Sequence, residues 1–526
     1  MSVNSIVWDR ETHPSRHAAA GGTEADALRE LGIPQLLFSR RELSDEEILG
    51  FLNCKGGDIV LRQGVLEEAL QKEELSSIFD ALLQSISKIK RYLKEYSIKD
   101  QEKIVCFQAL YLLLREYVQI IGQSRERLES AGVKSRGLTR LLHLFKELWD
   151  SQNLNALQES LSHIGEYWNP PKICEFGLNI DSGFHIKEIT VTKLFPQREF
   201  AESACFSRPT YLHRGTSTAK LQYYYFKKLK SLLNTELGRL QRDLKPFSPE
   251  LVSALLQLER EFTLYSAGIR WCQKIQRKNA VFCFPAVSQH TIRCRGMALP
   301  ETVEALETAD RYTVDLKDGE TVCIVTGAGS AYKDGFAAAL GANQVLFQLG
   351  FPVCASEAAL PVRERVFTIF AQGESEDESR FAREARLTAQ IERCGGESLV
   401  LLRDAYTSTN AREGEKIAAE LIEAVTKTGS IVVCSTHFAK LVSALADKNI
   451  PCASYVAASG TQEDGCVGNM LLRGEPYALS YARQLAQKHS FTVEAILEIL
   501  KSKDMSAETS ARLLRELALA EEGGAL

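Results

Sequence analysis

Apolar residues recur every three or four positions over much of the first 280 residues, with polar residues between them. That spacing lines the apolar side chains along one face of a helix and therefore predicts amphipathic helices. The predicted helices cover Leu66–Tyr96, Gln101–Leu128, Leu138–Ile164 and Pro249–Lys278, and a shorter one lies near Glu24–Leu31.

A short β-rich insert interrupts these helices. Pro170 and Pro171 break the helical pattern, because proline lacks the backbone N–H that a helix interior needs. Two strands, Ile173–Leu178 and His185–Val191, are predicted after them, joined by a turn at 181–183.

The segment Thr216–Leu244 is predicted to be a helix about 45 Å long at ~1.5 Å rise per residue. It carries six Lys or Arg residues around the aromatic run Tyr223–Phe226. Two interpretations stand: a contact with nucleic acid or an acidic protein, or a solvated face over an aromatic core stripe. The solvated face is the commoner case for a charged helix.

The pattern changes to short apolar runs after residue 280. Strands are predicted at Ala280–Phe284, His290–Cys294 and Tyr312–Leu316, and continuously apolar strands at Val322–Val325, Ser398–Leu402 and Ile431–Cys434. Helical patterns separate the last three strands, which is typical of a parallel sheet covered on both faces. A final helical segment is predicted at Tyr477–Leu519.

These patterns predict four parts in a chain that is too long for one core. Residues 1–40 form a flexible leader, and 41–290 an all-α, lever-like domain with a small β insert at 170–215. Ser44 and Glu47 form a capping box near the start of this domain. An α/β domain spans 291–480, and a helical segment covers 481–526.

Composition narrows the function. Lys plus Arg number 63 against 68 Asp plus Glu, which gives a net charge of -5. A dedicated nucleic-acid binder usually carries a basic surplus, so this balance argues against that role. The 13 cysteines include no Cys-x-x-Cys pair, which indicates free thiols in a reducing compartment and no metal site. No membrane-spanning run and no secretory signal is found, so a cytoplasmic protein is expected.

The first candidate for chemistry is the turn that follows Val322–Val325. The strand leads into Gly327 and Gly329 and then into an Ala-rich helix. Successive backbone N–H groups at such a turn can hold phosphate. Gly327 and Lys333 stand six positions apart, as the phosphate-loop pattern G-x-x-x-x-G-K-[ST] requires. A plain strand-to-helix turn is the alternative.

Two residues of this turn depart from the pattern. Tyr332 replaces the glycine before the lysine, where a side chain can obstruct the wrap of backbone around phosphate. Asp334 replaces the hydroxyl residue that would ligate magnesium. Its carboxylate adds negative charge beside a triphosphate, at a cost of ~1–4 kcal/mol under moderate screening.

The next two buried strands end in further candidates. Ser398–Leu402 leads into Arg403 and Asp404, where a working Walker B strand ends in Asp-Glu. Arg403 is no metal ligand, and it is expected to pair with Asp404 or Asp334. Ile431–Cys434 leads towards His437, where a switch histidine touching the terminal phosphate is expected in a nucleotide fold. Alternatively, these are buried strands with polar ends.

Taken in order, the segments resemble the ATPase domain of the MutS family. The matching stretches are Thr326–Gly335, 341–370, Ser379–Glu384 (the Ser-Thr-Phe-x-x-Glu signature), Asn410 with Gly414, Ser435–Leu441 and Leu479–Ala486. The resemblance implies a P-loop ATPase fold of the ABC/MutS type, preceded by the helical lever domain. It also implies a dimer in which the signature serine reaches the ATP of the opposite subunit.

The resemblance assigns seven residues to a degenerate site: nucleotide binding to Gly327, Gly329, Lys333, Asp334 and Ser379, and catalysis to Asp404 and His437. With these changes the chain is not expected to be a competent ATPase by itself. ATP and magnesium are then bound weakly, shared with a partner, or not bound at all.

Three hypotheses follow. In the first, the chain pairs with an active MutS-like ATPase, as a homo- or heterodimer. This arrangement resembles the MutS-related reactivases of cobalamin-dependent aminomutases of the lysine 5,6-aminomutase type, in which a companion subunit accompanies the ATPase. The second is a divergent ATP-dependent DNA-binding protein of DNA repair. The third is an interaction scaffold with an empty nucleotide fold.

Overall fold

The computed structural model describes residues 5–9, 21–38, 42–98, 103–167, 173–182, 186–195, 243–244, 246–247, 249–305, 310–327, 330–370, 379–461 and 467–476. The chain divides into two compact units. The helical unit comprises Met1–Glu11 and Gly64–Ile269, and the sheet unit comprises Thr12–Gln63 and Arg270–Leu526. The predicted domain boundaries stay predictions. The predicted helix Tyr477–Leu519, and Thr216–Leu244 up to residue 242, lie outside the described residues.

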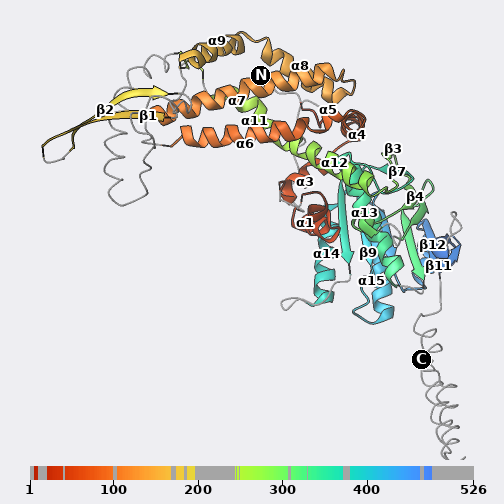
Figure 1. The fold of residues 1–526 in the computed structure, drawn as a ribbon. Coiled ribbons are helices and arrows are strands. Elements are labelled where there is room, and N and C mark those ends of the chain that lie inside the picture. The colour runs from red at the N-terminus through yellow and green to blue at the C-terminus, as the bar shows by residue number, and fades with distance from the viewer. Residues whose placement is uncertain are drawn as a thin grey trace, which may run out of the picture. The chain divides into compact units, whose positions relative to one another are not determined.

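Helices make up most of the described part of the helical unit (Figure 1). They are α5 (Glu73–Ser76), α6 (Ile78–Tyr96), α7 (Lys103–Ser130), α8 (Arg136–Trp149), α9 (Gln152–Tyr167), η2 (Pro249–Val252) and α11 (Ser253–Gln257), while α4 (Gly56–Gln71) and α12 (Glu259–Arg277) each contain a boundary between the units. α6 buries Ile78, Leu82, Ile86 and Ile89 at helical spacing. This apolar face packs against α7, which confirms the amphipathic pattern.

One described helical stretch, Val105–Ser130 within α7, is long and apolar enough to cross a membrane by length and composition alone. Half of its most apolar window is buried inside the protein. α6, α8 and α9 all pack against α7, as they would against the core helix of a bundle.

Three predicted helices are each broken into shorter pieces. The predicted helix Leu66–Tyr96 is interrupted at Lys72, whose backbone is extended while its ammonium bonds Glu68 and the carbonyl of Gly132. Leu138–Ile164 is interrupted near Ser151, because the Ser151 hydroxyl accepts a hydrogen bond from the N–H of Leu154 and so starts a new helix. Pro249–Lys278 begins as the 3-10 turn η2 and is broken again before α12.

Glu68 ties α4 to the start of α8. Its carboxylate accepts bonds from the Lys72 ammonium at 2.7 Å, from the N–H of Lys134 and from the N–H of Ser135. Burial by itself raises the pKa of Glu68, but these hydrogen bonds outweigh it and lower the pKa to about 2. The ionised carboxylate therefore stabilises the folded state.

Replacing Glu68 by glutamine is expected to cost roughly 2–3 kcal/mol of unfolding free energy at pH 7. Because the folded pKa lies below the ordinary value, the contribution is present above about pH 4.5 and is lost as pH falls towards 2. Urea unfolding at pH 7, 4 and 3 measures it. Glu74→Gln, at an exposed glutamate, is the matched control. A constant gap between wild type and Glu68→Gln over this range would contradict the assignment.

Two antiparallel strands follow α9. β1 (Ile173–Ile180) pairs with β2 (Ile186–Phe195) in a register that runs from Ile173 opposite Phe195 to Ile180 opposite Ile186. The pairing confirms the two predicted strands. The part of the predicted β insert beyond residue 195 lies outside the described residues.

A six-stranded sheet runs through the described part of the sheet unit, in the order β12-β11-β6-β10-β9-β8. The strands are β6 (Val322–Gly327), β8 (Arg365–Phe370), β9 (Ser398–Arg403), β10 (Ile431–Ser435), β11 (Cys452–Thr461) and β12 (Val467–Arg473). All neighbours pair in parallel except β11 and β12. The three predicted apolar strands are therefore confirmed as β6, β10 and β9, side by side.

Helices cover both faces of this sheet. α13 (Ser330–Leu349) packs against β6, β9 and β10. The opposite side chains of the same strands form a core with α14 (Arg380–Cys394), α15 (Ala411–Thr426) and α16 (Leu441–Asp447). Burial on both faces explains why these strands are continuously apolar. A mixed α/β architecture is thus confirmed, while a lever function of the helices stays a prediction.

A second sheet in the described residues has the order β3-β7-β4-β5. Its strands are β3 (Ala286–Ser288), β4 (Arg293–Met297), β5 (Tyr312–Asp315) and β7 (Glu357–Pro361). β5 is where the sequence predicts it. The predicted strand Ala280–Phe284 is wrong: Cys283 forms a single bridge with Val353, and Pro285 has no N–H to continue a ladder. The predicted strand His290–Cys294 is shifted to β4.

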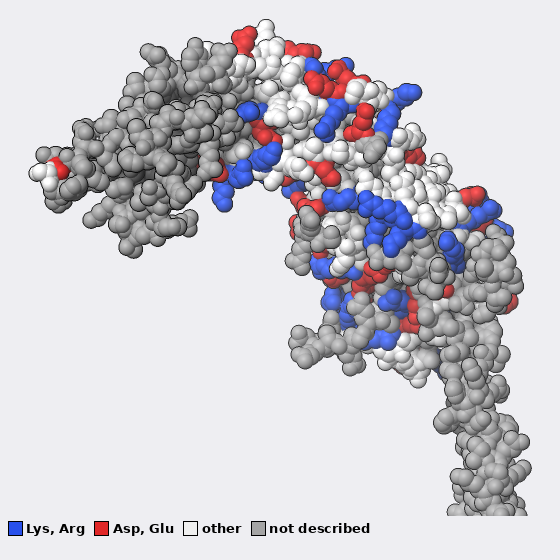
Figure 2. Space-filling view, viewed as in Figure 1, with Lys and Arg blue, Asp and Glu red and all other residues white. Residues whose placement is uncertain are grey.

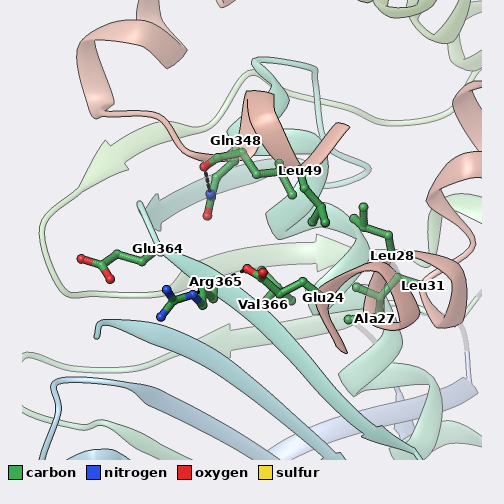
Figure 3. A pocket seen from close by; sticks show the side chains of 10 residues that line it. Glu24, Ala27, Leu28, Leu31, Leu49, Gln348, Glu364, Arg365 and Val366 are labelled. Carbon is green, nitrogen blue, oxygen red and sulfur yellow. Dashed lines mark hydrogen bonds and ion pairs between the residues drawn. The ribbon is translucent and has the colours of Figure 1, made fainter. Parts of the chain in front are cut away.

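Three N-terminal helices belong to the sheet unit: α1 (Gly21–Glu30), α2 (Ile33–Leu37) and α3 (Asp45–Leu52). The capping box is confirmed, since the Ser44 side chain accepts from the N–H of Glu47 and the Glu47 carboxylate accepts from the N–H of Ser44. α1 packs along β8, where the Glu24 carboxylate lies 3.8 Å from the Arg365 guanidinium (Figure 3). The enclosed cavity beside them is about 10 Å³, room for one water at most.

Candidate functional site

β6 ends in a glycine that the neighbouring strand requires. Gly327 has φ 147°, and a Cβ built on it would stand 2.7 Å from the carbonyl oxygen of Ala457 on β11. α13 begins three residues later at Ser330. The order strand, glycine turn and helix is therefore present. Gly329 lies outside the described residues, and phosphate binding by Gly327 and Gly329 stays a prediction.

The Tyr332 side chain is committed to an aromatic cluster. Its ring packs on Tyr312 with centroids 4.7 Å apart, and Tyr312 also contacts Phe336. The Tyr332 hydroxyl donates to the carbonyl of Arg311 at 2.7 Å, and burial raises the pKa of this hydroxyl. Gly335 leaves room for the cluster, because a Cβ there would stand 2.4 Å from the Tyr312 hydroxyl. The tyrosine in the glycine position therefore packs in the core between α13 and β5 and helps to stabilise it.

Lys333 lies at the centre of an ionic cluster. Its side chain is fully buried, and Nζ donates to Oδ1 and Oδ2 of Asp404 at 2.9 Å each and to Oδ1 of Asp334 at 3.1 Å. The Ser435 hydroxyl donates to the same Asp334 oxygen at 3.3 Å. We call Lys333, Asp334 and Asp404 the Lys333 cluster. The fold therefore brings together three of the predicted site residues.

Asp404 takes an uncommon backbone conformation at the end of β9. Its φ is 45°, in the left-handed region that side chains other than glycine rarely adopt. Its N–H donates to the carbonyl of Ser435 at 2.9 Å, and its own carbonyl accepts from Nη2 of Arg380 at 2.7 Å. These bonds hold the carboxylate over the carboxyl ends of β10 and β6, where ligands bind in parallel sheets.

Arg403 does not take the role expected of it. Its guanidinium lies over the Phe370 ring, 4.3 Å from the centroid, in a cation–π contact. The expected pairing with Asp404 or Asp334 is replaced by Lys333, which bonds both carboxylates.

His437 borders the cluster. Its Nε2 lies 3.8 Å from Oδ2 of Asp404, and its side chain is 49% exposed. An ion pair at this distance forms only when the ring is protonated. The histidine can therefore contact a ligand or solvent as well as the cluster. A switch role stays a prediction.

Ser379 stands apart from the cluster, at the exposed start of α14. Its hydroxyl accepts from the N–H of Ala382 at 3.3 Å and caps the helix. Phe381 beside it is 40% exposed, an uncommon setting for a large aromatic side chain. A capping serine and an aromatic ring are thus both presented outward here. The structure does not bring Ser379 into contact with the Lys333 cluster.

Arg380 and Glu384 are site residues that sequence reasoning missed. Arg380 bonds the Asp404 carbonyl, the Thr407 hydroxyl at 2.6 Å and Glu384 at 3.1 Å. Buried Glu384 in turn accepts from the N–H of Tyr406 at 3.2 Å. The sequence contained a sign of this role. The second position of the family signature is threonine, whereas this chain has Arg380, whose side chain bonds residues of its own chain.

Two residues of the matching turn after β9 have structural roles. Asn410 caps α15 by accepting from the N–H of Arg412 at 2.9 Å. A Cβ on Gly414 would stand 2.3 Å from the carbonyl of Tyr406, so the helix approaches the turn too closely for a side chain. Both residues fix the turn that follows Asp404.

The residues at this site do not fit ATP with magnesium in their present arrangement. A phosphate loop needs a lysine whose N–H groups are available and a hydroxyl for the metal. Lys333 is engaged by two carboxylates, and one of them, Asp334, stands in the hydroxyl position.

Comparison with known proteins supports the resemblance. The parallel sheet with a helix after a glycine turn defines a mixed α/β fold, and residues 323–499 match the family model of MutS domain V. The chain is 28% identical over 213 residues to the DNA mismatch repair protein MutS of Natronomonas pharaonis. This match covers 39% of this chain and 24% of that protein.

Further relatives give the same picture. MutS of Halalkalibacterium halodurans is 28% identical over 158 residues, or 29% of this chain and 18% of that protein. The MutS protein homolog him-14 of Caenorhabditis elegans is 27% identical over 176 residues, which make up 33% of this chain and 21% of that protein. The chain thus matches about a quarter or less of the length of these relatives. Together the matches support a relationship between this chain and the MutS family.

Removing the Lys333 ammonium is expected to destabilise the sheet unit. Lys333→Ala leaves two facing carboxylates without their shared cation, at a cost of about 3 kcal/mol of unfolding free energy. Asp404→Asn should cost less, because one carboxylate still pairs with the lysine. Urea unfolding measures both. Lys416→Ala, at a 78% exposed lysine, is the control and should change little. Equal stability of Lys333→Ala and wild type would refute a structural role for the cluster.

Proposed function

We propose that this chain is a MutS-related subunit whose own nucleotide site does not hydrolyse ATP, and that it forms a pair with an active MutS-like ATPase. The observation that carries the proposal is the Lys333 cluster. The cation that a phosphate loop offers to ATP is bonded here by the chain's own carboxylates.

The chemistry of phosphoryl transfer supports this reading. It needs a cation on the transferred phosphate, ligands for magnesium, and a carboxylate that orients the attacking water. The magnesium-binding end of a Walker B strand is Arg403 in this chain, and its guanidinium lies on Phe370. Asp404 is one methylene shorter than glutamate and its carboxylate bonds Lys333, so this carboxylate is not available to orient water.

The pairing is supported by the start of α14. In the MutS-type dimer that the resemblance implies, the signature serine serves the opposite subunit. Ser379 is exposed at a helix N-terminus, and Phe381 next to it is exposed too. A helix N-terminus is electropositive and suits the phosphates of a neighbouring chain. A subunit of this kind contributes Ser379 to the ATP site of its partner and does not hydrolyse a nucleotide itself.

The client of such a pair stays a prediction. The resemblance to reactivating chaperones of cobalamin-dependent aminomutases implies that ATP use by the partner opens the mutase and releases damaged cobalamin. The test is whether an aminomutase and a MutS-like ATPase both co-purify with this chain from its native cell. Co-purification of DNA-repair proteins in place of an aminomutase would contradict the aminomutase as the client.

A divergent DNA-binding ATPase of DNA repair is the second candidate. It is favoured by the similarity to relatives that are named DNA mismatch repair proteins. The basic segment Thr216–Leu244 would then contact DNA. Against it stands the net charge of -5. On the face drawn in Figure 2, the described Lys and Arg side chains have Asp and Glu side chains beside them. DNA affinity that falls steeply with added salt, with ATP turnover by the chain alone, would favour this candidate.

Under the first candidate, Ser379→Ala is expected to lower the ATPase rate of the co-purified MutS-like partner at least about tenfold, because one hydrogen-bond donor to the phosphates is lost. Steady-state phosphate release by the reconstituted pair measures it. Ser443→Ala, which removes an exposed hydroxyl on α16, is the control. An unchanged partner rate with Ser379→Ala, or normal magnesium-dependent turnover by the isolated chain, would rule the proposal out.

A further inference from the structure

The ammonium of Lys333 has no N–H left for a ligand. A lysine ammonium offers three donors. The structure supplies three acceptors within 3.1 Å: both oxygens of Asp404 and one of Asp334. Because the lysine side chain is fully buried, it cannot reach a second partner through solvent. A phosphate can bond Lys333 only if it displaces a carboxylate.

The charges of the cluster favour the carboxylates over a phosphate as partners of Lys333. Lys333 carries one positive charge, while Asp334 and Asp404 carry two negative charges. A polyphosphate approaching this cluster meets a net negative charge, which raises the free energy of binding. If the Asp404 charge is removed, Lys333 and Asp334 balance, and two N–H donors become available. Asp404 therefore decides whether the site accepts an anion.

Asp404 is held in place through its backbone as well as its side chain. Arg380 bonds the Asp404 carbonyl at 2.7 Å and the Thr407 hydroxyl at 2.6 Å. The same guanidinium is braced by Glu384, which also accepts from the N–H of Tyr406. Asp404 and Tyr406 both have positive φ, at 45° and 61°. Such residues cost free energy that neighbouring bonds must offset. Arg380 supplies a bond at Asp404, and Glu384 supplies one at Tyr406.

We propose that Asp404 occupies the phosphate position beside Lys333, and that Arg380 is the positioning residue that holds it there. The ligand that Asp404 excludes is a polyphosphate anion such as a nucleoside triphosphate. The inference rests on the proposed function in one respect, since it takes Lys333 to be the phosphate-binding cation of a MutS-type site. It adds that this chain keeps a phosphate-binding cation and that removal of the Asp404 carboxylate is what makes this cation available.

The experiment measures binding of ATP with magnesium to the purified full chain by isothermal titration calorimetry. Asp404→Ala is expected to raise the affinity for ATP at least tenfold over wild type. Arg380→Ala is expected to raise it by a smaller factor, because Asp404 loses its anchor but keeps its charge. Arg412→Ala, at an exposed arginine on α15 with a similar charge change, is the matched control and should leave the affinity unchanged.

A second pair of variants assigns any gain to Lys333. Adding Lys333→Met to Asp404→Ala is expected to remove the gain, since the freed cation is gone. Asp404→Asn keeps the side-chain shape and is the variant to use if Asp404→Ala fails to fold; a smaller gain in the same direction is expected. Affinity equal to wild type in folded Asp404→Asn and Asp404→Ala, or a gain that persists without Lys333, would overturn the proposal.

The two proposals fail separately. ATP affinity of the isolated chain depends on Asp404 and Arg380, whereas the proposed function is read from the partner's ATPase rate with Ser379→Ala. A normal Ser379 effect with no gain from Asp404→Ala rejects only the blocked site. A gain from Asp404→Ala with no Ser379 effect rejects only the pairing.

Discussion

A buried ammonium shared by two carboxylates is the interaction on which the rest of the sheet unit depends. Lys333 stands in the first turns of α13 and Asp404 at the end of β9. The pair therefore joins the helix that follows β6 to the loop that follows β9. Charges in such a setting persist only when they are matched. The match fixes the loop after β9, and Arg380 extends this constraint to the start of α14.

The sheet explains why the polar groups meet where they do. β6, β10 and β9 are parallel and adjacent, so their carboxyl ends lie at one edge. Gly327, Ser435 and Asp404 follow from three distant parts of the chain and meet at that edge. Both faces of the strands are covered by helices, and so the ends are the places where polar side chains can reach solvent or a ligand.

Sequence patterns predicted what depends on local spacing. The central strands, the capping box at Ser44 and the positions of Lys333 and Asp404 could all be read from apolar runs and short motifs. The direction of a side chain was not predictable in the same way. Tyr332 turns towards Tyr312, twenty residues away, and Arg403 turns towards Phe370. The breaks near Lys72 and Ser151 were missed because single side-chain hydrogen bonds decide them.

Helix α1 lies along β8, the outer strand of the large sheet. A bare outer strand offers unpaired N–H and C=O groups, and another chain can extend the sheet there by adding a strand of its own. At β8 that route is shut by a helix from the same polypeptide. A strand from a second molecule would have to displace α1 before its backbone could pair with β8.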